Sequence, residues 1–220
     1  VYKSSPFGVV SSFLIGISHS AVFSLIAVYA TSMNFSILEV SIVTFLFAIS
    51  GAISQWPIGK LSDVLDRRIV IIYTTFGAAL FCFLAIISSG QMYMPAGLAT
   101  SKIFFYICIM CFSFCSLPMF ALIFAHTNDF IPKEKFVAAG AGLQFVFGLG
   151  AICGPFMCSL FMEFLGENGF FIFLIIFHSF IGLFGIYRMQ VRESGDNPDS
   201  QFVPMPQTIT PAGIELNPST

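Results

Sequence analysis

Gly59-Lys60-Leu61-Ser62-Asp63-Val64-Leu65-Asp66-Arg67-Arg68 is a short charged stretch that places two carboxylates and three cations between two long apolar segments. These segments, residues 36–58 and 69–88, are each about as long as the roughly 20 apolar residues that a helix needs to cross a lipid bilayer. Because so few residues separate them, the chain must leave the bilayer and return through a tight loop. The stretch therefore predicts two membrane helices joined by a charged loop.

The composition extends this interpretation to the whole chain of 220 residues. Apolar residues make up 57% and charged residues only 9%, whereas a soluble domain has about 45–50% and about 25%. The mean hydropathy is +0.92. A soluble domain and a disordered chain are therefore excluded. The net charge of -2 leaves no basic field for a nucleic acid. We expect a polytopic protein in contact with the lipid bilayer.

Six apolar stretches are long enough to cross a bilayer, and they are expected to be helical because lipid offers no partner for backbone N–H and C=O groups. The expected fold class is thus all-α, a bundle of six transmembrane helices over residues 1–189, followed by a polar, Pro-rich tail over residues 190–220. We expect Ser36 to cap the second helix and Pro118 to bend the fourth. The expected helices cover residues 7–30, 36–58, 69–88, 100–125, 136–165 and 170–187.

The Lys and Arg residues predict the orientation, because cytoplasmic loops of membrane proteins carry an excess of them. With six spans both termini lie on one side, and that side carries all of these cations except Lys102. We therefore expect an integral, multi-pass protein of the inner (plasma) membrane with both termini in the cytoplasm. The cations on the cytoplasmic side are Lys3, Lys60, Arg67, Arg68, Lys133, Lys135, Arg188 and Arg192.

Polar side chains inside the expected helices are candidates for a substrate or proton site, because a polar group in lipid is costly unless it faces a cavity or a partner. His19 lies near the centre of the first helix, and a His can carry a proton near neutral pH. Ser113 and Ser116 lie in the fourth helix, Gln144 in the fifth and His178 in the sixth. The alternative for each residue is a hydrogen bond to a neighbouring helix that only stabilises the bundle.

Three cysteines of the fourth helix, Cys108, Cys111 and Cys115, share one helix face. A soft metal ion such as Cu(I) could bind there, but small packing residues explain the same spacing. No metal site is therefore expected. The chain also contains no nucleophile elbow, no Walker loop and no spaced set of His, Asp and Glu ligands. We expect no cofactor and no enzyme activity.

The charged stretch resembles the signature loop of the major facilitator superfamily, a family of membrane transporters, through the pattern Gly-x-Leu-Ser-Asp-x-x-x-Arg-Arg. Val64 stands where the family usually has Arg, and Asp66 where Gly is common. Further segments resemble the C-terminal half of YcaD-like transporters of this superfamily, over essentially the whole chain. They are Gln55–Gly59, Ala125–Asp129, Gly148–Pro155, Tyr187–Met189 and Thr210–Pro218.

The resemblance implies that the six helices are helices seven to twelve of a twelve-helix protein, so that an N-terminal six-helix half is a missing partner. The first residue, Val1, also suggests a fragment. Such a protein is implied to work by alternating access, in which two bundles rock about a substrate site near the bilayer midplane. On this interpretation the chain is half of a secondary active transporter of a small solute, with H⁺ as a candidate co-substrate.

The resemblance also assigns a gating role to the charged loop. In the family, the Asp at the position of Asp63 interacts with a helix terminus of the opposite half, and the Arg at the position of Arg67 pairs with an acid at a neighbouring helix end. We expect Asp129 to be that acid, because it follows the fourth helix on the same side of the membrane. Gly59 is expected to turn the chain sharply at the helix end, and Arg68 completes the motif.

A glycine-rich segment in the fifth helix, Gly148, Gly150, Gly154 and Pro155, resembles the Gly-Pro motif of antiporters. Small residues let two helices approach closely. We interpret the segment as a helix-packing face, which does not establish proton exchange.

Two other functions remain open on the residues alone. A self-contained six-helix membrane protein could act as a homodimer or a scaffold, and the cysteines of the fourth helix could serve a metal-handling protein. An upstream six-helix segment would favour the transporter over the scaffold. Copper binding that is lost in Cys111→Ser would favour the metal-handling protein.

Overall fold

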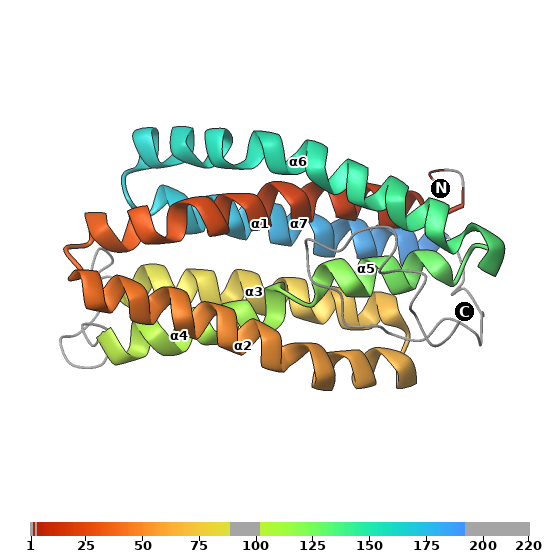
Figure 1. Ribbon diagram of the computed structural model, residues 1–220, viewed down its shortest axis with the longest axis horizontal. Helices are drawn as coiled ribbons and strands as arrows, with labels where there is room; N and C mark the ends of the chain where they lie inside the picture. Colours follow the sequence, from red (N-terminus) through yellow and green to blue (C-terminus); the bar gives the residue numbers. More distant parts are fainter. Residues whose placement is uncertain (1, 3, 89–101, 192–220) are drawn as a thin grey trace.

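Seven α-helices form the regular structure of the described residues together with one short 3-10 helix, which confirms the all-α fold class (Figure 1). The computed structural model describes Tyr2, residues 4–88 and residues 102–191. Lys3, residues 100 and 101 of the expected fourth helix, and residues 192–220 of the expected tail lie outside the described residues. The elements are α1 (Pro6–Ser32), α2 (Ile37–Val64), α3 (Arg67–Ser88), α4 (Lys102–Ser116), α5 (Met119–Asn128), η1 (Lys133–Lys135), α6 (Phe136–Leu165) and α7 (Gly169–Val191).

Six segments of the described residues are long and apolar enough to cross a membrane. They run along the long axis of the bundle in alternating directions (Figure 1). α4 and α5 together form the fourth segment, Lys102–Asn128. α1 packs mainly against α6, α3 packs against α7 and α4, and α2 packs against α4. Because the direction alternates, α1, α3 and α6 begin where α2, α5 and α7 end. We call this end of the bundle the Arg67 end and the other the far end.

The helices differ in how much of their surface the bundle covers. The most apolar window of α2 is 28% buried and that of α6 is 22% buried, whereas the other four spans bury 50–67%. The core therefore lies between α1, α3, the fourth span and α7. Aromatic rings in this core surround the buried Tyr29. The centroid of the Tyr29 ring lies 5.3 Å from that of Phe170 and 4.8 Å from that of Phe171.

The expected loop at residues 59–68 is shorter than the sequence predicts. α2 continues to Val64 and α3 begins at Arg67, so only Leu65 and Asp66 connect the two helices. The prediction that Gly59 turns the chain is wrong, because Gly59 lies inside α2, where its carbonyl oxygen accepts a hydrogen bond of 2.8 Å from Ser62 Oγ. Charged residues mark where a span leaves the apolar part of a bilayer, and a helix can extend beyond that point.

The prediction that Ser36 caps the second helix is confirmed. Its hydroxyl accepts from the backbone N–H of Glu39, and the Glu39 carboxylate accepts from the backbone N–H of Ser36 at 2.8 Å, which completes a capping box. Glu39 also pairs with Lys102 at the start of α4, which ties α2 to α4 at the far end.

The fourth span is broken in its middle, at Leu117 and Pro118. α4 ends at Ser116 and α5 begins at Met119. A proline inside a helix has no N–H to donate, and its ring clashes with the preceding turn, so the regular backbone hydrogen bonds are interrupted. The polar backbone of Ser116 therefore lies at an irregular point in the interior, where another helix can reach it.

Two of the three expected packing glycines hold α6 against α1. A Cβ atom at Gly150 would lie 2.2 Å from the carbonyl oxygen of Phe13, and one at Gly154 would lie 2.2 Å from that of Ile17. Gly16 of α1 meets α6 in the same way, since its Cβ would lie 2.2 Å from the carbonyl oxygen of Phe147. Gly148 does not take part in this contact, because no atom of the described residues lies within 4 Å of a Cβ there. Pro155 lies inside α6, half-buried.

We predict that Gly150→Ala destabilises the protein and that Gly148→Ala does not. The added methyl group at Gly150 meets rigid backbone, so α1 and α6 must separate, at a cost of about 1–3 kcal/mol. At Gly148 the same methyl group enters open space and improves helix propensity, by up to about 1 kcal/mol. The free energy of unfolding in mixed micelles checks this. Equal losses for the two variants would contradict the packing.

Candidate functional site

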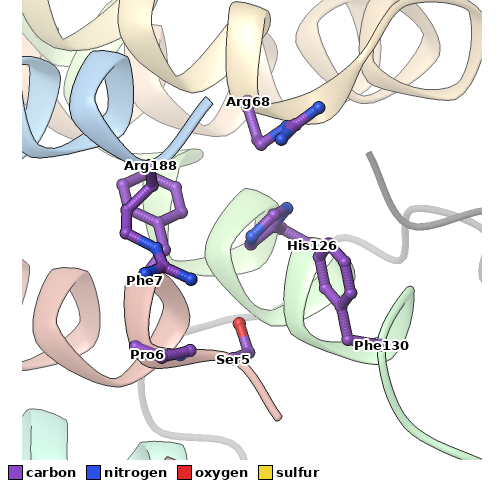
Figure 2. Close-up of a pocket in the computed structure, with 7 residues that line it drawn as sticks. All are labelled: Ser5, Pro6, Phe7, Arg68, His126, Phe130 and Arg188. Atoms are coloured by element: carbon purple, nitrogen blue, oxygen red, sulfur yellow. The ribbon is translucent and has the colours of Figure 1, made fainter. Parts of the chain in front are cut away.

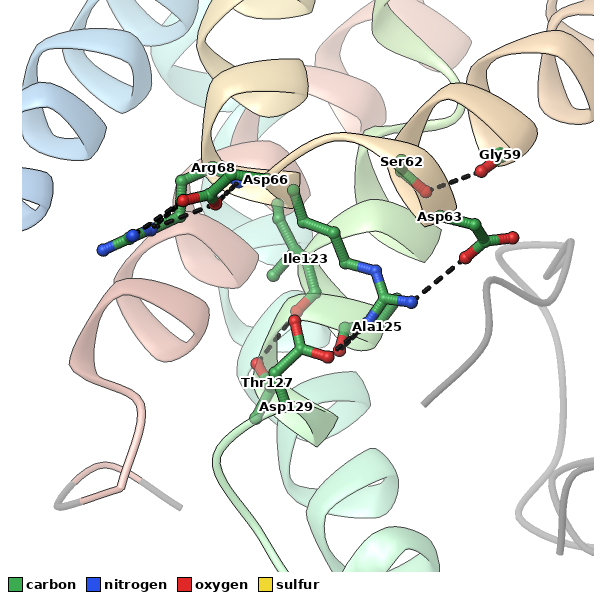
Figure 3. Close-up of polar contacts among 10 residues, drawn as sticks. Gly59, Ser62, Asp63, Asp66, Arg68, Ile123, Ala125, Thr127 and Asp129 are labelled. Atoms are coloured by element: carbon green, nitrogen blue, oxygen red, sulfur yellow. Dashed lines mark hydrogen bonds and ion pairs between the residues drawn. The ribbon is translucent and has the colours of Figure 1, made fainter. Parts of the chain in front are cut away.

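Arg67 is the centre of an ion-pair cluster at the Arg67 end. Only 8% of its side chain is exposed, although it is the first residue of α3. Its Nη2 donates to Asp63 Oδ1 at 3.1 Å, across the break between α2 and α3. Its Nη1 donates to Asp129, the partner expected from the sequence, and to the carbonyl oxygen of Ala125 at 3.3 Å. Asp63 and Asp129 approach the guanidinium from different elements (Figure 3).

The cluster joins the ends of three helices. Asp63 belongs to the last turn of α2, Arg67 begins α3, and Ala125 and Asp129 belong to the end of α5. The bond to Ala125 also places a cation at the carbonyl end of α5, where a helix favours positive charge. A buried ion pair of this kind contributes little over an apolar contact, but removing one member leaves an uncompensated charge. The cluster is therefore sensitive to the loss of either partner.

Arg68 belongs to a separate pair. Asp66 Oδ1 accepts from the Arg68 backbone N–H at 2.9 Å, and Asp66 Oδ2 accepts from Arg68 Nη2 at 2.7 Å. Burial of Asp66 opposes its ionisation, but the hydrogen bonds from Arg68 outweigh this and hold the pKa of Asp66 below its usual value. The bond to the backbone N–H of Arg68 makes Asp66 a cap for α3, which gives a structural role to a residue where the family commonly has Gly.

A second polar group lies in the interior, beside the break in the fourth span. His19 of α1 and His178 of α7 are fully buried, and Ser116 lies between them. His19 Nε2 is 3.1 Å from the carbonyl oxygen of Ser116 and 3.2 Å from its Oγ. Ser116 Oγ is 2.8 Å from His178 Nε2. Hydrogen bonds to Ser116 of α4 therefore connect α1, α4 and α7.

The acceptors in this group determine the direction of its hydrogen bonds. His178 Nδ1 lies 2.9 Å from the carbonyl oxygen of Leu174, which can only accept, and 3.3 Å from Ser18 Oγ, which can accept or donate. We assign the proton to Nδ1, because both neighbours can then accept from it. Nε2 of the neutral His178 ring is then an acceptor, and the Ser116 hydroxyl donates to it. His19 Nε2 faces the Ser116 carbonyl oxygen and donates. The group is thus a one-way chain from His19 through Ser116 to His178 and Leu174.

The other two expected cavity residues, Ser113 and Gln144, lie on α4 and α6. Ser113, fully buried one turn before Ser116, donates to the carbonyl oxygen of Phe47 and so links α4 to α2. Gln144 is half-buried on α6, three residues before Phe147. The centroid of the Phe147 ring lies 6.3 Å from that of the His19 ring. The sequence shows that His19 and His178 are polar residues inside spans, but only the tertiary packing shows that one serine joins them.

The cysteines do not form a metal site in the part of the chain that the structure describes. No group of three or more His, Cys, Asp or Glu residues there could hold a metal ion. Cys108 is buried in the core, and Cys111 and Cys115 are half-buried.

Comparisons with known proteins identify relatives of this chain. The family model described as Major Facilitator Superfamily matches residues 8–215. An uncharacterised MFS-type transporter of Yersinia enterocolitica is 23% identical over 200 residues, which cover 91% of this chain and 47% of the relative. An uncharacterised MFS-type transporter of Bacillus subtilis is 27% identical over 183 residues, or 80% of this chain and 43% of the relative. The chain thus spans less than half the length of either relative.

We predict that Arg67→Ala and Asp129→Ala are not additive. Each single change leaves a charge in a largely buried site, at a cost of about 3–5 kcal/mol, whereas the double variant removes both charges and loses less than the sum. A double-mutant cycle on the free energy of unfolding measures this coupling.

The Glu39–Lys102 pair at the far end is the matched control. Its Lys side chain is 53% exposed, so Lys102→Ala should change stability little. Additive losses for Arg67→Ala and Asp129→Ala would show that the two residues act independently.

Proposed function

This chain belongs to the major facilitator superfamily of membrane transporters, and we propose that it is the C-terminal six-helix half of a secondary active transporter that moves a small solute by alternating access. The observation that carries the proposal is the match of the family model to residues 8–215, over a bundle of six spans. A transporter of this type needs a second bundle, because the substrate site lies between two repeats that move against each other.

Two observations support the assignment as one half. The chain covers 47% and 43% of the two relatives described above. In addition, α2 and α6 leave most of their residues uncovered, including Trp56 at 67% exposed and Phe156 at 69% exposed. A second six-helix bundle would cover part of these two helices, and lipid would cover the rest. From the sequence resemblance we also propose that the whole protein is a YcaD-like transporter.

We assign a gating role to the cluster around Arg67. Arg67 and Asp129 are largely buried, whereas 38% of the Asp63 side chain is exposed. Asp63 is therefore the member that a helix end of the other half can reach. A contact there would compete with the bond from Arg67, so docking of the second half would be coupled to the packing of α2, α3 and α5.

The group formed by His19, Ser116 and His178 is the proposed proton site. A proton added to His178 Nε2 turns that atom from acceptor to donor, and the Ser116 hydroxyl must then turn away. Protonation therefore changes the contacts of α4 with α7 beside the break at Pro118, where the fourth span can bend.

The excess of cations at the Arg67 end supports a proposed orientation. Lys60, Arg67, Arg68 and Arg188 belong to this end among the described residues, and the Lys133–Lys135 segment follows α5 there. We place this end in the cytoplasm and the protein in the inner (plasma) membrane. A homodimer or a scaffold is not favoured, because nothing in the family match calls for one.

We predict that the whole protein couples solute movement to protons through His178. In liposomes loaded with a pH-sensitive dye, a panel of small solutes identifies one that the protein transports. His178→Gln keeps hydrogen-bonding groups but cannot take up the proton, so solute-driven acidification should fall at least about tenfold. Exchange of the same solute across the membrane, which needs no net proton movement, should persist.

Cys115→Ser is the control, because it changes α4 next to Ser116 without touching the two histidines. It should keep both activities. If liposomes with His178→Gln acidify as much as liposomes with the unchanged protein when the solute is added, His178 is excluded as the proton site. Absence of any solute-dependent flux across the panel, with the protein folded and inserted, would count against the transporter itself.

A further inference from the structure

A recess opens at the Arg67 end between four helices (Figure 2). Arg68, which lines it, and Asp63 lie on opposite sides of the start of α3 (Figure 3). The recess is shallow and open to solvent, and the empty space in and above it amounts to about 250 Å³. Arg68, His126 and Arg188 form its polar wall, and Phe7 and Phe130 form its apolar wall. No acidic side chain is among the described residues that line it.

Arg188 supplies the positive charge of the recess. It lies in the last turn of α7, half-buried. In the part of the chain that the structure describes, no hydrogen bond or ion pair joins its guanidinium to another residue. A cation in this position also stabilises the end of its own helix, but that effect requires no neighbouring helix. Arg188 instead faces residues of α1, α3 and α5 across the recess.

The other charged groups near the recess do not cancel this charge. Arg68 is balanced by Asp66, with which it makes bonds of 2.7 and 3.1 Å. The first turn of α1 also begins at the recess, and a helix N-terminus carries a partial positive charge. The carbonyl ends of α5 and α7 carry partial negative charges that offset those at the starts of α1 and α3. The local sum is therefore positive because of Arg188.

Two further polar side chains are held in place around the same space. The His126 ring lies edge-on to Phe7 and Phe130, with centroids 5.1 and 5.0 Å apart. Ser5 Oγ accepts from the backbone N–H of Gly8 at 3.2 Å, so its own hydrogen can be donated to a ligand. Figure 2 shows Arg188, His126 and Ser5 around one space, each from a different helix or helix cap.

The position of the recess fits a phosphate group. α1 and α3 begin here, and α5 and α7 end here, which is the level at which spans leave the apolar part of a bilayer. Basic pockets between membrane helices at this level bind lipid headgroups, and an Arg guanidinium matches the geometry of phosphate oxygens. The two Phe rings give the recess an apolar side as well.

We propose that this recess binds a phosphate group through Arg188, with His126, Ser5 and the start of α1 as further contacts. The phosphate is that of an anionic phospholipid or of a soluble phosphate, and the two sources have the same recognition chemistry. This site is separate from the proton site and does not depend on transport.

The test uses the whole protein, purified and stripped of lipid, and the variants Arg188→Gln and Lys135→Gln. Lys135 is an exposed cation at the same end of the bundle and does not line the recess. Native mass spectrometry measures binding of phosphatidylglycerol, with phosphatidylcholine of the same acyl chains as the neutral lipid. A thermal-stability titration with inorganic phosphate, against chloride at equal ionic strength, measures binding of the soluble group.

We expect Arg188→Gln to weaken binding roughly tenfold, the effect of losing one charge-assisted hydrogen bond, and Lys135→Gln to leave it unchanged. Arg188→Lys should restore part of the affinity. If Arg188→Gln loses only the binding of phosphatidylglycerol, the bound phosphate is that of a lipid. If Arg188→Gln loses the stabilisation by inorganic phosphate, the bound phosphate is a soluble anion. Equal binding by Arg188→Gln and Lys135→Gln in both assays would overturn the site.

Discussion

The guanidinium of Arg67 holds the Arg67 end of the bundle together. Its partners Asp63, Ala125 and Asp129 come from the ends of α2 and α5, while Arg67 itself begins α3. A charge so little exposed is tolerated only while its partners surround it. The three helix ends are therefore fixed relative to one another as long as the cluster is complete, and a change at one helix end is transmitted to the other two.

The need for partners also explains how polar groups are arranged in the interior of the bundle. A bilayer offers no water to satisfy a polar group, so each buried donor or acceptor needs a partner from the protein. Pro118 interrupts the fourth span and leaves the backbone of Ser116 in the middle of the bundle, and His19 meets it from α1. His178 completes the group from α7. A break that would be costly in lipid thus becomes the point where three helices are joined by hydrogen bonds.

Much of this architecture could be predicted from the residues. The length of the apolar segments determines the six spans, and Ser36 and Glu39 mark a helix start. The family resemblance implied an acidic partner for Arg67, and the position of Asp129 after the fourth helix made it the candidate. Other features depend on tertiary contacts. The difference between Gly148 and Gly150 follows from the face that α6 turns to α1. The bridge between His19 and His178 links residues far apart in the chain, and no local pattern reveals it.

The central claim is that these six helices are one half of a larger transporter, and the intact mass of the protein from its native membranes tests it most directly. This chain has a mass of 24.1 kDa. The account predicts a native polypeptide of roughly twice that mass, because two six-helix bundles are needed to form the substrate site between them. A native polypeptide near 24 kDa would contradict the account, since the six helices would then have no second half in the same chain.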